Sequence, residues 1–505
     1  MSEASIREIR LEKLARLREL GHDPFSIEEW HRDFTVEQVL EKFEELSTEF
    51  LDSGKKFKVA GRIHSMRIMG KAAFADVDDG TARVQIYVKR DDVGDDLWEV
   101  FKLADVGDHI GVEGYPFITK TGEKSLHVTG FHLLSKALEP LPLGKEKDGH
   151  VWYGLADVEQ RYRRRHLDLI ANPESRALHI ARMRMVTAVR HYLDSAGYLE
   201  VETPILQVVA GGAAARPFTT HYNAYEMDVK LRISLELYLK RLICADLPAV
   251  YEIGRVFRNE GVSNRHNPEF TMLEFYEAYT NLEGMMRRVE ELFKHVCKEV
   301  FKTTKVTVGE HELDFSQPWK RLELLSALET YAGVKPEELE SLDSAKKSLE
   351  RCGISAENEN NIGGIIEKFL EKTVEPTLVH PTFITGYPIE TSPLAKKDPN
   401  RPGFTRRFEG YVLCREVCNA FSEINDPIDQ RERFEMQLKQ RELGDDEAHP
   451  MDEDFLYALE CGMPPTGGCG IGIDRLVMTL TGAEHLREIL LFPMMRPEEP
   501  TAEPG

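Results

Sequence analysis

The sequence lacks the long apolar runs and the apolar leader that membrane and secreted proteins carry. No stretch of the 505 residues approaches the roughly 18–20 consecutive apolar residues that cross a bilayer. The amino-terminal segment, MSEASIREIRLEKLARLREL, is charged throughout and therefore has no apolar core of a signal peptide. We expect a cytoplasmic protein.

Cysteine is scarce and dispersed. An odd number of scattered cysteines, seven here, favours free thiols in a reducing compartment. Cys414 and Cys418 are close in sequence, but no second pair stands at zinc-site spacing. These spacings favour small buried side chains over a metal site.

Positive charge is in deficit, with 65 Lys and Arg against 87 Asp and Glu and a formal net charge of −22. Taken alone, this balance argues against nucleic-acid binding, because an acidic field repels phosphates. Two basic patches run against the balance, one in the amino-terminal segment and one at residues 161–166, RYRRRH. For either patch alone, a solvated surface is the simpler interpretation.

The length exceeds that of one ordinary core, so two or three domains are expected. Near-helical leucine spacing predicts helix at the start, and a Pro- and Gly-rich charged stretch predicts a linker. We predict a helical segment at 1–54, a barrel at 55–140, a linker at 141–166, a second domain at 167–497 with a helical insertion at about 320–372, and a disordered tail at 498–505.

Alternation with period two marks the barrel region. It predicts strands at 57–65, 72–79, 83–89, 109–117 and 125–134, with a short helix near 95–104. Five strands with a helix between the third and fourth suit an OB-type barrel, a fold that often binds single-stranded nucleic acid.

Residues 250–279 read as strand, loop and strand. Alternation puts Phe270, Met272, Glu274 and Tyr276 on one face of the second strand, where an acid and a phenol beside an aromatic suggest a pocket wall. The loop is rich in groups that suit phosphate or carboxylate binding: Arg258, Asn259, Glu260, Arg265, His266 and Asn267. A surface hairpin with ion pairs remains the alternative for the loop alone.

Residues 408–426 carry two acids, Glu409 and Glu416, beside a strand that places Asn419, Phe421 and Glu423 on one face. Two converging carboxylates can hold Mg²⁺, which needs oxygen ligands and retains several waters. Two solvated acids are the alternative, and spacing does not decide between them.

Residues 467–475, GGCGIGIDR, alternate glycine at 468, 470 and 472 before Arg475. A bare strand face can accept a flat ligand, and Arg475 can stack on a base or reach a phosphate, although tight strand packing also uses glycine. A P-loop is excluded because Gly-Lys-Ser/Thr is missing, and the dinucleotide fingerprint because its third glycine is absent.

Together these segments resemble the signature motifs of class II aminoacyl-tRNA synthetases. The helix at 178–193 with the strand ending at Pro204 is similar to motif one, FRNE with RHNPEF to motif two, and GIGIDR to motif three. The preceding barrel resembles that of the subclass charging aspartate, asparagine or lysine. GGAAARPF, LELYLKR, SPLAK and NAFSEINDP resemble the bacterial lysyl-tRNA synthetases.

The resemblance implies an α+β fold, with an OB-type barrel followed by an antiparallel sheet flanked by helices. It implies attachment of lysine to tRNA(Lys) with ATP through a lysyl-adenylate, with Mg²⁺ as cofactor and a homodimer as the assembly.

The resemblance also implies which residues bind each ligand. For ATP they are Arg258, Glu260, Arg265, His266, Asn267, Phe270, Glu409, Gly472 and Arg475, of which Arg258 and Arg475 would be catalytic. For lysine they are Gly212, Glu236, Arg258, Glu274, Tyr276, Asn419, Phe421 and Glu423. For Mg²⁺ they are Glu409 and Glu416, and for the anticodon Arg67, Phe74, Gln85 and Glu123.

The charge of the predicted pocket distinguishes lysine from the alternative substrates. A lysine side chain needs an acid in the pocket, and Glu423, Glu274 and Tyr276 supply one, whereas the aspartate enzyme would need cations there. A protein-lysylating paralogue would lack the barrel, and a non-catalytic synthetase-like RNA binder would lack catalytic residues that are present here. Leu235 departs from the family pattern, since a proline often precedes the glutamate there, and this departure puts the role of Glu236 in doubt.

Overall fold

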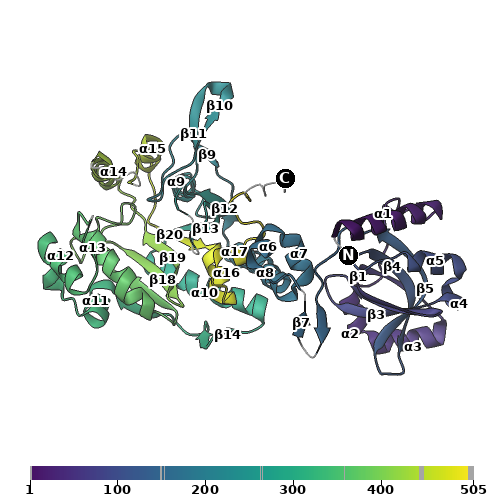
Figure 1. Ribbon diagram of the computed structural model, residues 1–505. Helices are drawn as coiled ribbons and strands as arrows, with labels where there is room; N and C mark the ends of the chain where they lie inside the picture. Colours follow the sequence, from purple (N-terminus) through teal and green to yellow (C-terminus); the bar gives the residue numbers. More distant parts are fainter. Residues whose placement is uncertain are drawn as a thin grey trace, which may run out of the picture. The chain divides into compact units, whose positions relative to one another are not determined.

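The computed structural model describes residues 3–147, 150–152, 154–261, 263, 266–357, 359–442 and 448–498. The chain divides into two compact units, Met1–Asn172 and Pro173–Gly505 (Figure 1). No helix in the described ranges is long and apolar enough to cross a membrane. All seven cysteines are free, as their dispersion predicts.

The first unit contains a closed five-stranded barrel with strand order β1-β2-β3-β5-β4, which confirms the predicted OB-type fold. Neighbouring strands are antiparallel except β3 and β5, which run parallel. Alternate residues such as Val84, Ile86 and Val88 point into a core that Phe101 closes. The elements are β1 (Phe57–Met69), β2 (Ala72–Asp78), β3 (Arg83–Lys89), α4 (Arg90–Val93), α5 (Asp95–Lys102), β4 (His109–Ile118) and β5 (Lys124–Ser135).

The amino-terminal segment is helical, as predicted, and is divided into three helices. It forms α1 (Glu3–Glu19), α2 (Val36–Glu41) and α3 (Phe43–Ser53). Gly21 adopts φ +81°, which ends the first helix, and Thr35 starts the second with a capping box.

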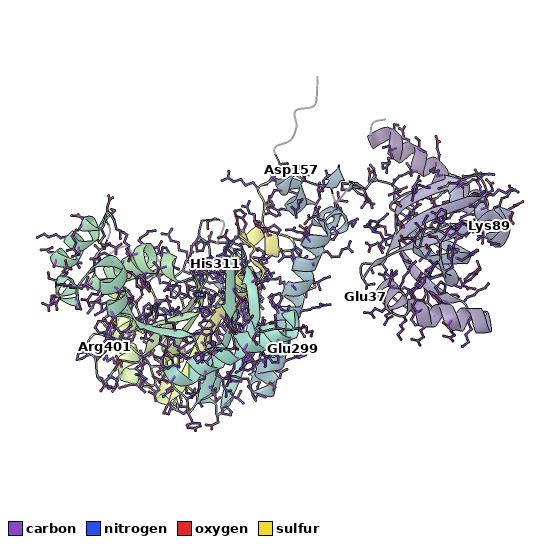
Figure 2. The ribbon with its side chains drawn as sticks, turned by 90° about the horizontal axis from the view of Figure 1, so that it is seen from below. Glu37, Lys89, Asp157, Glu299, His311 and Arg401 are labelled. Atoms are coloured by element: carbon purple, nitrogen blue, oxygen red, sulfur yellow. The ribbon has the colours of Figure 1, made fainter. Side chains whose placement is uncertain are left out.

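The predicted linker region holds regular structure. A short hairpin of β6 (Lys145–Lys147) and β7 (His150–Trp152) precedes α6 (Val158–Arg163) and α7 (Arg165–Ala171). Asp157, labelled in Figure 2, stands directly before α6. It caps this helix by accepting the Gln160 N–H at 2.7 Å. In the basic run, Arg161 and Arg165 each donate to buried Asp168 at 2.6 Å, so this patch is not simply a solvated surface.

The second unit is built on an eight-stranded sheet of order β16-β17-β18-β19-β20-β13-β12-β8. Its six central strands are antiparallel, as predicted, but both edge strands run parallel to their neighbours, so the sheet is mixed. The strands are β8 (Leu199–Glu200), β12 (Ala249–Phe257), β13 (Glu269–Ala278), β16 (Lys320–Glu323), β17 (Thr382–Thr385), β18 (Arg407–Val412), β19 (Arg415–Ser422) and β20 (Thr466–Gly472).

One face of this sheet is covered by α8 (Pro173–Ser195), α10 (Leu282–Phe301) and α16 (Ile473–Thr481). Leu273 and Phe275 of β13 point into that core, so the intervening side chains of β13 point to the opposite face. The alternation predicted for β13 is thereby confirmed. Further elements are α14 (Pro427–Glu442), α15 (Glu453–Glu460), α17 (Leu486–Ile489) and the hairpin of β14 (Lys305–Val308) and β15 (His311–Asp314).

The strand predicted to end near Pro204 is interrupted. Only two residues pair in β8, and after Pro204, which cannot donate a backbone hydrogen bond, β9 (Leu206–Gln207) joins a separate sheet. That sheet contains β10 (Thr219–Tyr222) and β11 (Met227–Leu231). The helix α9 (Glu236–Cys244) follows it.

The predicted insertion is helical but begins with a strand, β16, of the large sheet. Its helices are α11 (Leu324–Ala332), α12 (Leu342–Arg351) and α13 (Ile362–Phe369). They share a small core with Ile384 and Tyr411 of the sheet, so the insertion packs onto the sheet edge.

Candidate active site

A cavity of about 560 Å³ lies in the second unit, on the sheet face opposite the helical core. It collects most of the predicted site residues, which come from three strands, two helices and three loops. Its lining includes Gly212, Glu236, Arg258, Glu260, His266, Asn267, Phe270, Glu274, Tyr276, Glu416, Asn419, Phe421, Glu423, Gly472 and Arg475. Glu409 is not part of the lining, and Arg265 lies outside the described residues.

The glycines of β20 form the cavity floor between β13 and β19. Gly470 pairs with Glu274 on one side and Asn419 on the other, and Gly468 pairs in the same way with Tyr276 and Phe421. A Cβ at Gly468 would lie 2.2 Å from Glu423 Oε1 and 2.4 Å from Tyr276 Cε1. The bare face therefore also makes room for the pocket's own side chains.

Arg258 follows β12 and faces the cavity. Its guanidinium carbon lies 5.1 Å from the Phe270 ring centroid, and its Nε donates to the Ile233 carbonyl at 3.4 Å. Burial lowers the pKa of Arg258. No carboxylate in the described ranges forms an ion pair with Arg258, so the group is available for an anionic ligand.

Arg475, in the first turn of α16, is held by Glu416. Its Nη1 contacts Glu416 Oε2 at 2.6 Å and the Glu416 carbonyl at 3.3 Å. Glu416 raises the pKa of Arg475. The Glu416 carboxylate is about one-third exposed and reaches the cavity from β19.

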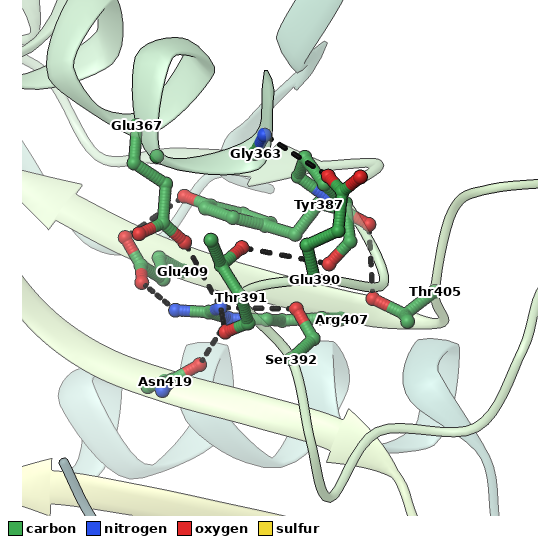
Figure 3. Close-up of polar contacts among 12 residues, drawn as sticks. Gly363, Glu367, Tyr387, Glu390, Thr391, Ser392, Thr405, Arg407, Glu409 and Asn419 are labelled. Atoms are coloured by element: carbon green, nitrogen blue, oxygen red, sulfur yellow. Dashed lines mark hydrogen bonds and ion pairs between the residues drawn. The ribbon is translucent and has the colours of Figure 1, made fainter. Parts of the chain in front are cut away.

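Glu409 is more enclosed than Glu416. Its Oε1 accepts from Arg407 at 2.5 Å, and its Oε2 accepts from Tyr387 at 2.8 Å and also from Tyr411 (Figure 3). No cage of three or more metal-binding side chains occurs in the described part of the chain. Glu416 is the carboxylate that faces the cavity as an oxygen ligand of the kind that Mg²⁺ takes, whereas both oxygens of Glu409 accept hydrogen bonds from the protein.

The far end of the cavity is acidic. Glu236, Glu274 and Glu423 are each buried, and one buried ammonium, Lys240, contacts Glu236 at 2.6 Å and Glu423 at 2.5 Å. Tyr276 donates to Glu274 at 3.0 Å. Burial raises the pKa of Glu423 to about 8 and that of Glu274 to about 7. Two carboxylates on the Lys240 ammonium, with the carboxylate of Glu274 near them on the cavity wall, leave room electrostatically for a second cation.

The barrel of the first unit carries a row of side chains in direct cross-strand register. Arg67 pairs with Phe74, Phe74 with Tyr87, Tyr87 with His127, and His127 with Tyr115. Ring centroids are 4.9 Å apart for Phe74 and Tyr87 and 5.2 Å for Tyr87 and His127.

The other predicted anticodon residues lie beside this row. Gln85 accepts from Ser125 at 3.0 Å, and Glu123 precedes β5 in the turn. The row offers a partly exposed aromatic surface on which bases can stack.

Comparison with known proteins identifies both units. Residues 57–134 match the family model of the OB-fold nucleic acid binding domain, and residues 157–496 match that of class II tRNA synthetases (D, K and N). The lysine–tRNA ligase of Bacillus subtilis (strain 168) is 50% identical over 490 residues, which is 97% of each chain. Those of Bacillus cereus (strain B4264) and Thermoanaerobacter sp. (strain X514) are also 50% identical, over 97% of this chain and 96% of the relative.

The chain belongs to the lysine–tRNA ligase family. This membership confirms the resemblance drawn from the motifs and supports aminoacylation of tRNA as the activity. The family is ATP-dependent, and the glycine-floored cavity is where the residues expected to bind ATP and lysine come together.

Three residues at this cavity were not predicted from the sequence. Arg407 and His449 line it, and Lys240 contacts the lining residues Glu236 and Glu423. Lys240 stands four residues after Glu236 on α9, a spacing at which helical side chains meet, so it could have been found. His449 accepts the Gly212 N–H at 2.8 Å, with Gly212 at φ +90°. Burial lowers the pKa of His449 to about 4, which keeps this acceptor neutral. No sequence pattern links His449 to Gly212.

Leu235 does not displace Glu236. Leu235 is the residue before α9, and Glu236 begins the helix and lines the cavity. The Leu235 N–H donates to Glu274 Oε1 at 3.2 Å, a contact that proline could not make. The departure from the family pattern thus adds a donor to a buried carboxylate.

Proposed function

We propose that the protein attaches L-lysine to tRNA(Lys) with ATP, through a lysyl-adenylate. The observation that carries the proposal is the buried acidic end of the cavity, where Glu236 and Glu423 share the ammonium of Lys240 and, among the described residues, Glu274 has no ammonium partner. A second ammonium about 4 Å from a carboxylate gains roughly 4 kcal/mol at an effective dielectric of 20, before desolvation. The side chain of lysine supplies such a group, and that of aspartate or asparagine does not.

Lysine is proposed to lie along the glycine floor. Glu423 and Tyr276 would hold its ε-ammonium, with Glu274 behind them and Phe421 beside its aliphatic chain. Glu236 and the Gly212 carbonyl would take the α-ammonium, and Arg258 with Asn419 the carboxylate. The support is that these residues line one cavity, and that Glu274 and Tyr276 of β13 lie across the β20 glycines from Asn419 and Phe421 of β19.

ATP is proposed to occupy the arginine end. Phe270 and Arg475 would enclose the adenine above Gly472, and Arg258 would bind the α-phosphate. Arg265 and His266 of the loop would hold the outer phosphates, with Glu260 and Asn267 nearby. Mg²⁺ would be held by Glu416 and Glu409, and when bound it would neutralise charge on the phosphate oxygens.

The reaction needs no protein nucleophile. An oxygen of the lysine carboxylate forms a bond to the ATP α-phosphorus while the bond to pyrophosphate breaks. The terminal ribose hydroxyl of tRNA, the 3′-hydroxyl in class II enzymes generally, then attacks the lysyl carbonyl and AMP leaves. Arg258 would stabilise charge at the α-phosphorus, so catalysis rests on positioning and electrostatics.

Charging assays test this function. The protein, ATP, Mg²⁺ and radiolabelled lysine should convert tRNA(Lys) into acid-precipitable lysyl-tRNA. Omission of ATP should abolish the product, and labelled aspartate or asparagine should give none. Charging with aspartate in place of lysine would overturn the assignment of the acidic pocket.

The barrel is proposed to bind the anticodon, with Phe74 stacking on a base and Arg67, Gln85 and Glu123 contacting its neighbours. Phe74→Ala should raise the KM for tRNA about 5- to 100-fold, because stacking on an aromatic contributes about 1–3 kcal/mol per base. Lysine-dependent pyrophosphate exchange should be unchanged. Phe25→Ala removes another exposed aromatic of this unit, away from the row, and serves as the control. An equal tRNA KM in both variants would contradict the role of Phe74.

A homodimer is proposed from apolar surface around motif one. The sequence placed Ile180 and Met183 on the apolar face of α8, and in the structure these two are 36% and 53% exposed, whereas Val189 and Leu193 are buried. Leu199, Leu206 and Val208 add further exposed apolar side chains. A partner chain would cover them. Sedimentation should give twice the chain mass, and Met183→Asp should shift it towards the monomer, whereas a monomeric wild type would contradict the proposal.

We also propose a cytoplasmic location, in line with the proposed substrate tRNA. Recovery of the native protein mainly in a membrane fraction would contradict it.

A further inference from the structure

Arg407, at the start of β18, joins several parts of the second unit at the cavity wall (Figure 3). It is buried, and its guanidinium lies 4.3 Å from the Tyr387 ring centroid. Each nitrogen of the guanidinium has its own acceptor. Nε donates to Asn419 at 3.2 Å, Nη2 to Glu409 at 2.5 Å, and Nη1 to the Thr391 carbonyl at 2.9 Å, Ser392 Oγ at 3.1 Å and Glu367 at 3.3 Å.

The contact with Asn419 fixes which end of its amide faces the cavity. The Oδ1 atom is taken by Arg407, so the NH₂ group is the end left to meet a ligand. An NH₂ group is the right partner for a carboxylate. Without Arg407 the amide could turn and present its oxygen, which would repel the same carboxylate.

The contact with Glu409 fixes the position of the second of the two carboxylates that are proposed to hold Mg²⁺. Arg407 takes one oxygen, and the Tyr387 and Tyr411 hydroxyls take the other. Burial of Glu409 is tolerable because Arg407 supplies the opposite charge within hydrogen-bond distance.

The anchors of Arg407 come from the insertion and the loop behind it. Glu367 lies on α13, and Glu390 accepts the Gly363 N–H at 3.0 Å, which ties the start of α13 to the loop that carries Thr391 and Ser392. The insertion, for which the sequence indicated no role, is thereby connected to the site through Glu367.

We propose that Arg407 is a positioning residue that orients Asn419 towards the lysine carboxylate and fixes Glu409, and that α13 helps to hold it through Glu367. The inference rests on the proposed function. Arg407 itself need not touch a substrate. A lysine at this position would keep the charge but lose the planar guanidinium that donates to five acceptors at once.

The test compares Arg407→Lys with Arg406→Lys in lysine-dependent pyrophosphate exchange. Arg406 is a matched control because its guanidinium pairs with Glu283 at 3.0 Å, away from the cavity. Arg407→Lys should raise the lysine KM about tenfold or more, equivalent to roughly 1.4 kcal/mol, and should raise the Mg²⁺ concentration for half-maximal rate. Arg406→Lys should change neither. A lysine KM and Mg²⁺ dependence like wild type in Arg407→Lys would overturn the proposal.

A double-mutant cycle separates positioning from a merely structural effect. In an Asn419→Ala background, Arg407→Lys should add less than about twofold to the lysine KM, because contacting residues are not additive. Full additivity of the two changes would show that Arg407 does not act through Asn419. Should Arg407→Lys fail to fold, Glu367→Gln takes its place. It should raise the lysine KM severalfold, and an unchanged value would count against the anchor.

Exchange by the wild type tests the proposed function, and exchange by the Arg407→Lys variant tests the role of Arg407. Absence of exchange with lysine in the wild type would remove the proposed function itself. Normal wild-type exchange with an indifferent Arg407→Lys variant would remove only the role of Arg407.

Discussion

Arg258→Ala is expected to lower lysine-dependent pyrophosphate exchange by about 10²–10³-fold, while the protein stays folded. The basis is electrostatic. Arg258 faces the cavity without an ion-pair partner in the described residues, and a preorganised donor at a charged transition state contributes about 2.7–4 kcal/mol. Both kcat and kcat/KM for lysine should fall, because the contact is strongest when the α-phosphorus is under attack.

Arg255→Ala is the matched control for this change. Arg255 is exposed on the same strand, β12, and the side chain does not line the cavity. Circular dichroism and thermal unfolding should match wild type for both variants. Near-normal exchange by folded Arg258→Ala would contradict the assignment of this arginine to the α-phosphate.

Glu423→Gln is expected to raise the lysine KM about 10- to 150-fold and to change the ATP KM by less than about twofold. Hydrogen bonds to charged groups contribute roughly 1.5–3 kcal/mol, and the glutamine keeps the size while removing the charge. Glu432→Gln on α14 removes an exposed carboxylate and serves as the control. Equal changes in the two KM values would mean that Glu423 does not bind the ammonium.

The pH dependence of lysine binding gives a second measure of the same group. Burial raises the pKa of Glu423 to about 8, so the carboxyl is partly protonated at pH 7. A bound ammonium favours the ionised form, so the lysine KM should fall as pH rises from about 6 to 8. The dependence should be shallower in Glu423→Gln. Identical slopes in the two proteins would contradict ionisation of Glu423 on binding.

Local alternation predicted what lies on one strand, and there the structure agrees with the sequence. Phe270, Met272, Glu274 and Tyr276 face the cavity because period two is fixed by the pleat. The glycines of β20 were predicted to bare one face, and they do, although part of the space serves Tyr276 and Glu423. The barrel followed from the same periodicity.

Contacts between distant segments could not be predicted in this way. His449 and Gly212 are 237 residues apart, and Lys240 meets Glu423 only because α9 packs beside the sheet. Arg407 lies two residues before Glu409 in sequence, but its other hydrogen bonds join it to the distant residues Asn419, Ser392 and Glu367. Pairing of this kind is decided by packing, which spacing along one segment does not encode.

The fold corrections have local causes. The helical segment predicted at the amino terminus consists of three helices, because Gly21 ends the first and Thr35 caps the second. The strand of motif one is shorter than predicted, because β8 ends at Glu200 and the Thr203 N–H turns to the Glu252 side chain at 3.1 Å instead of a neighbouring strand. Parallel pairing at both edges of the large sheet depends on which distant strand docks there, β8 at one edge and β16 at the other.

Pyrophosphate exchange with ATP and Mg²⁺, measured separately with each of the twenty amino acids, tests the central claim most directly. The account predicts exchange with lysine alone, because only lysine brings a side-chain ammonium of the right length to the carboxylates around Lys240. Exchange with aspartate or asparagine would contradict the reading of the pocket, and no exchange with any amino acid would contradict the proposed catalysis.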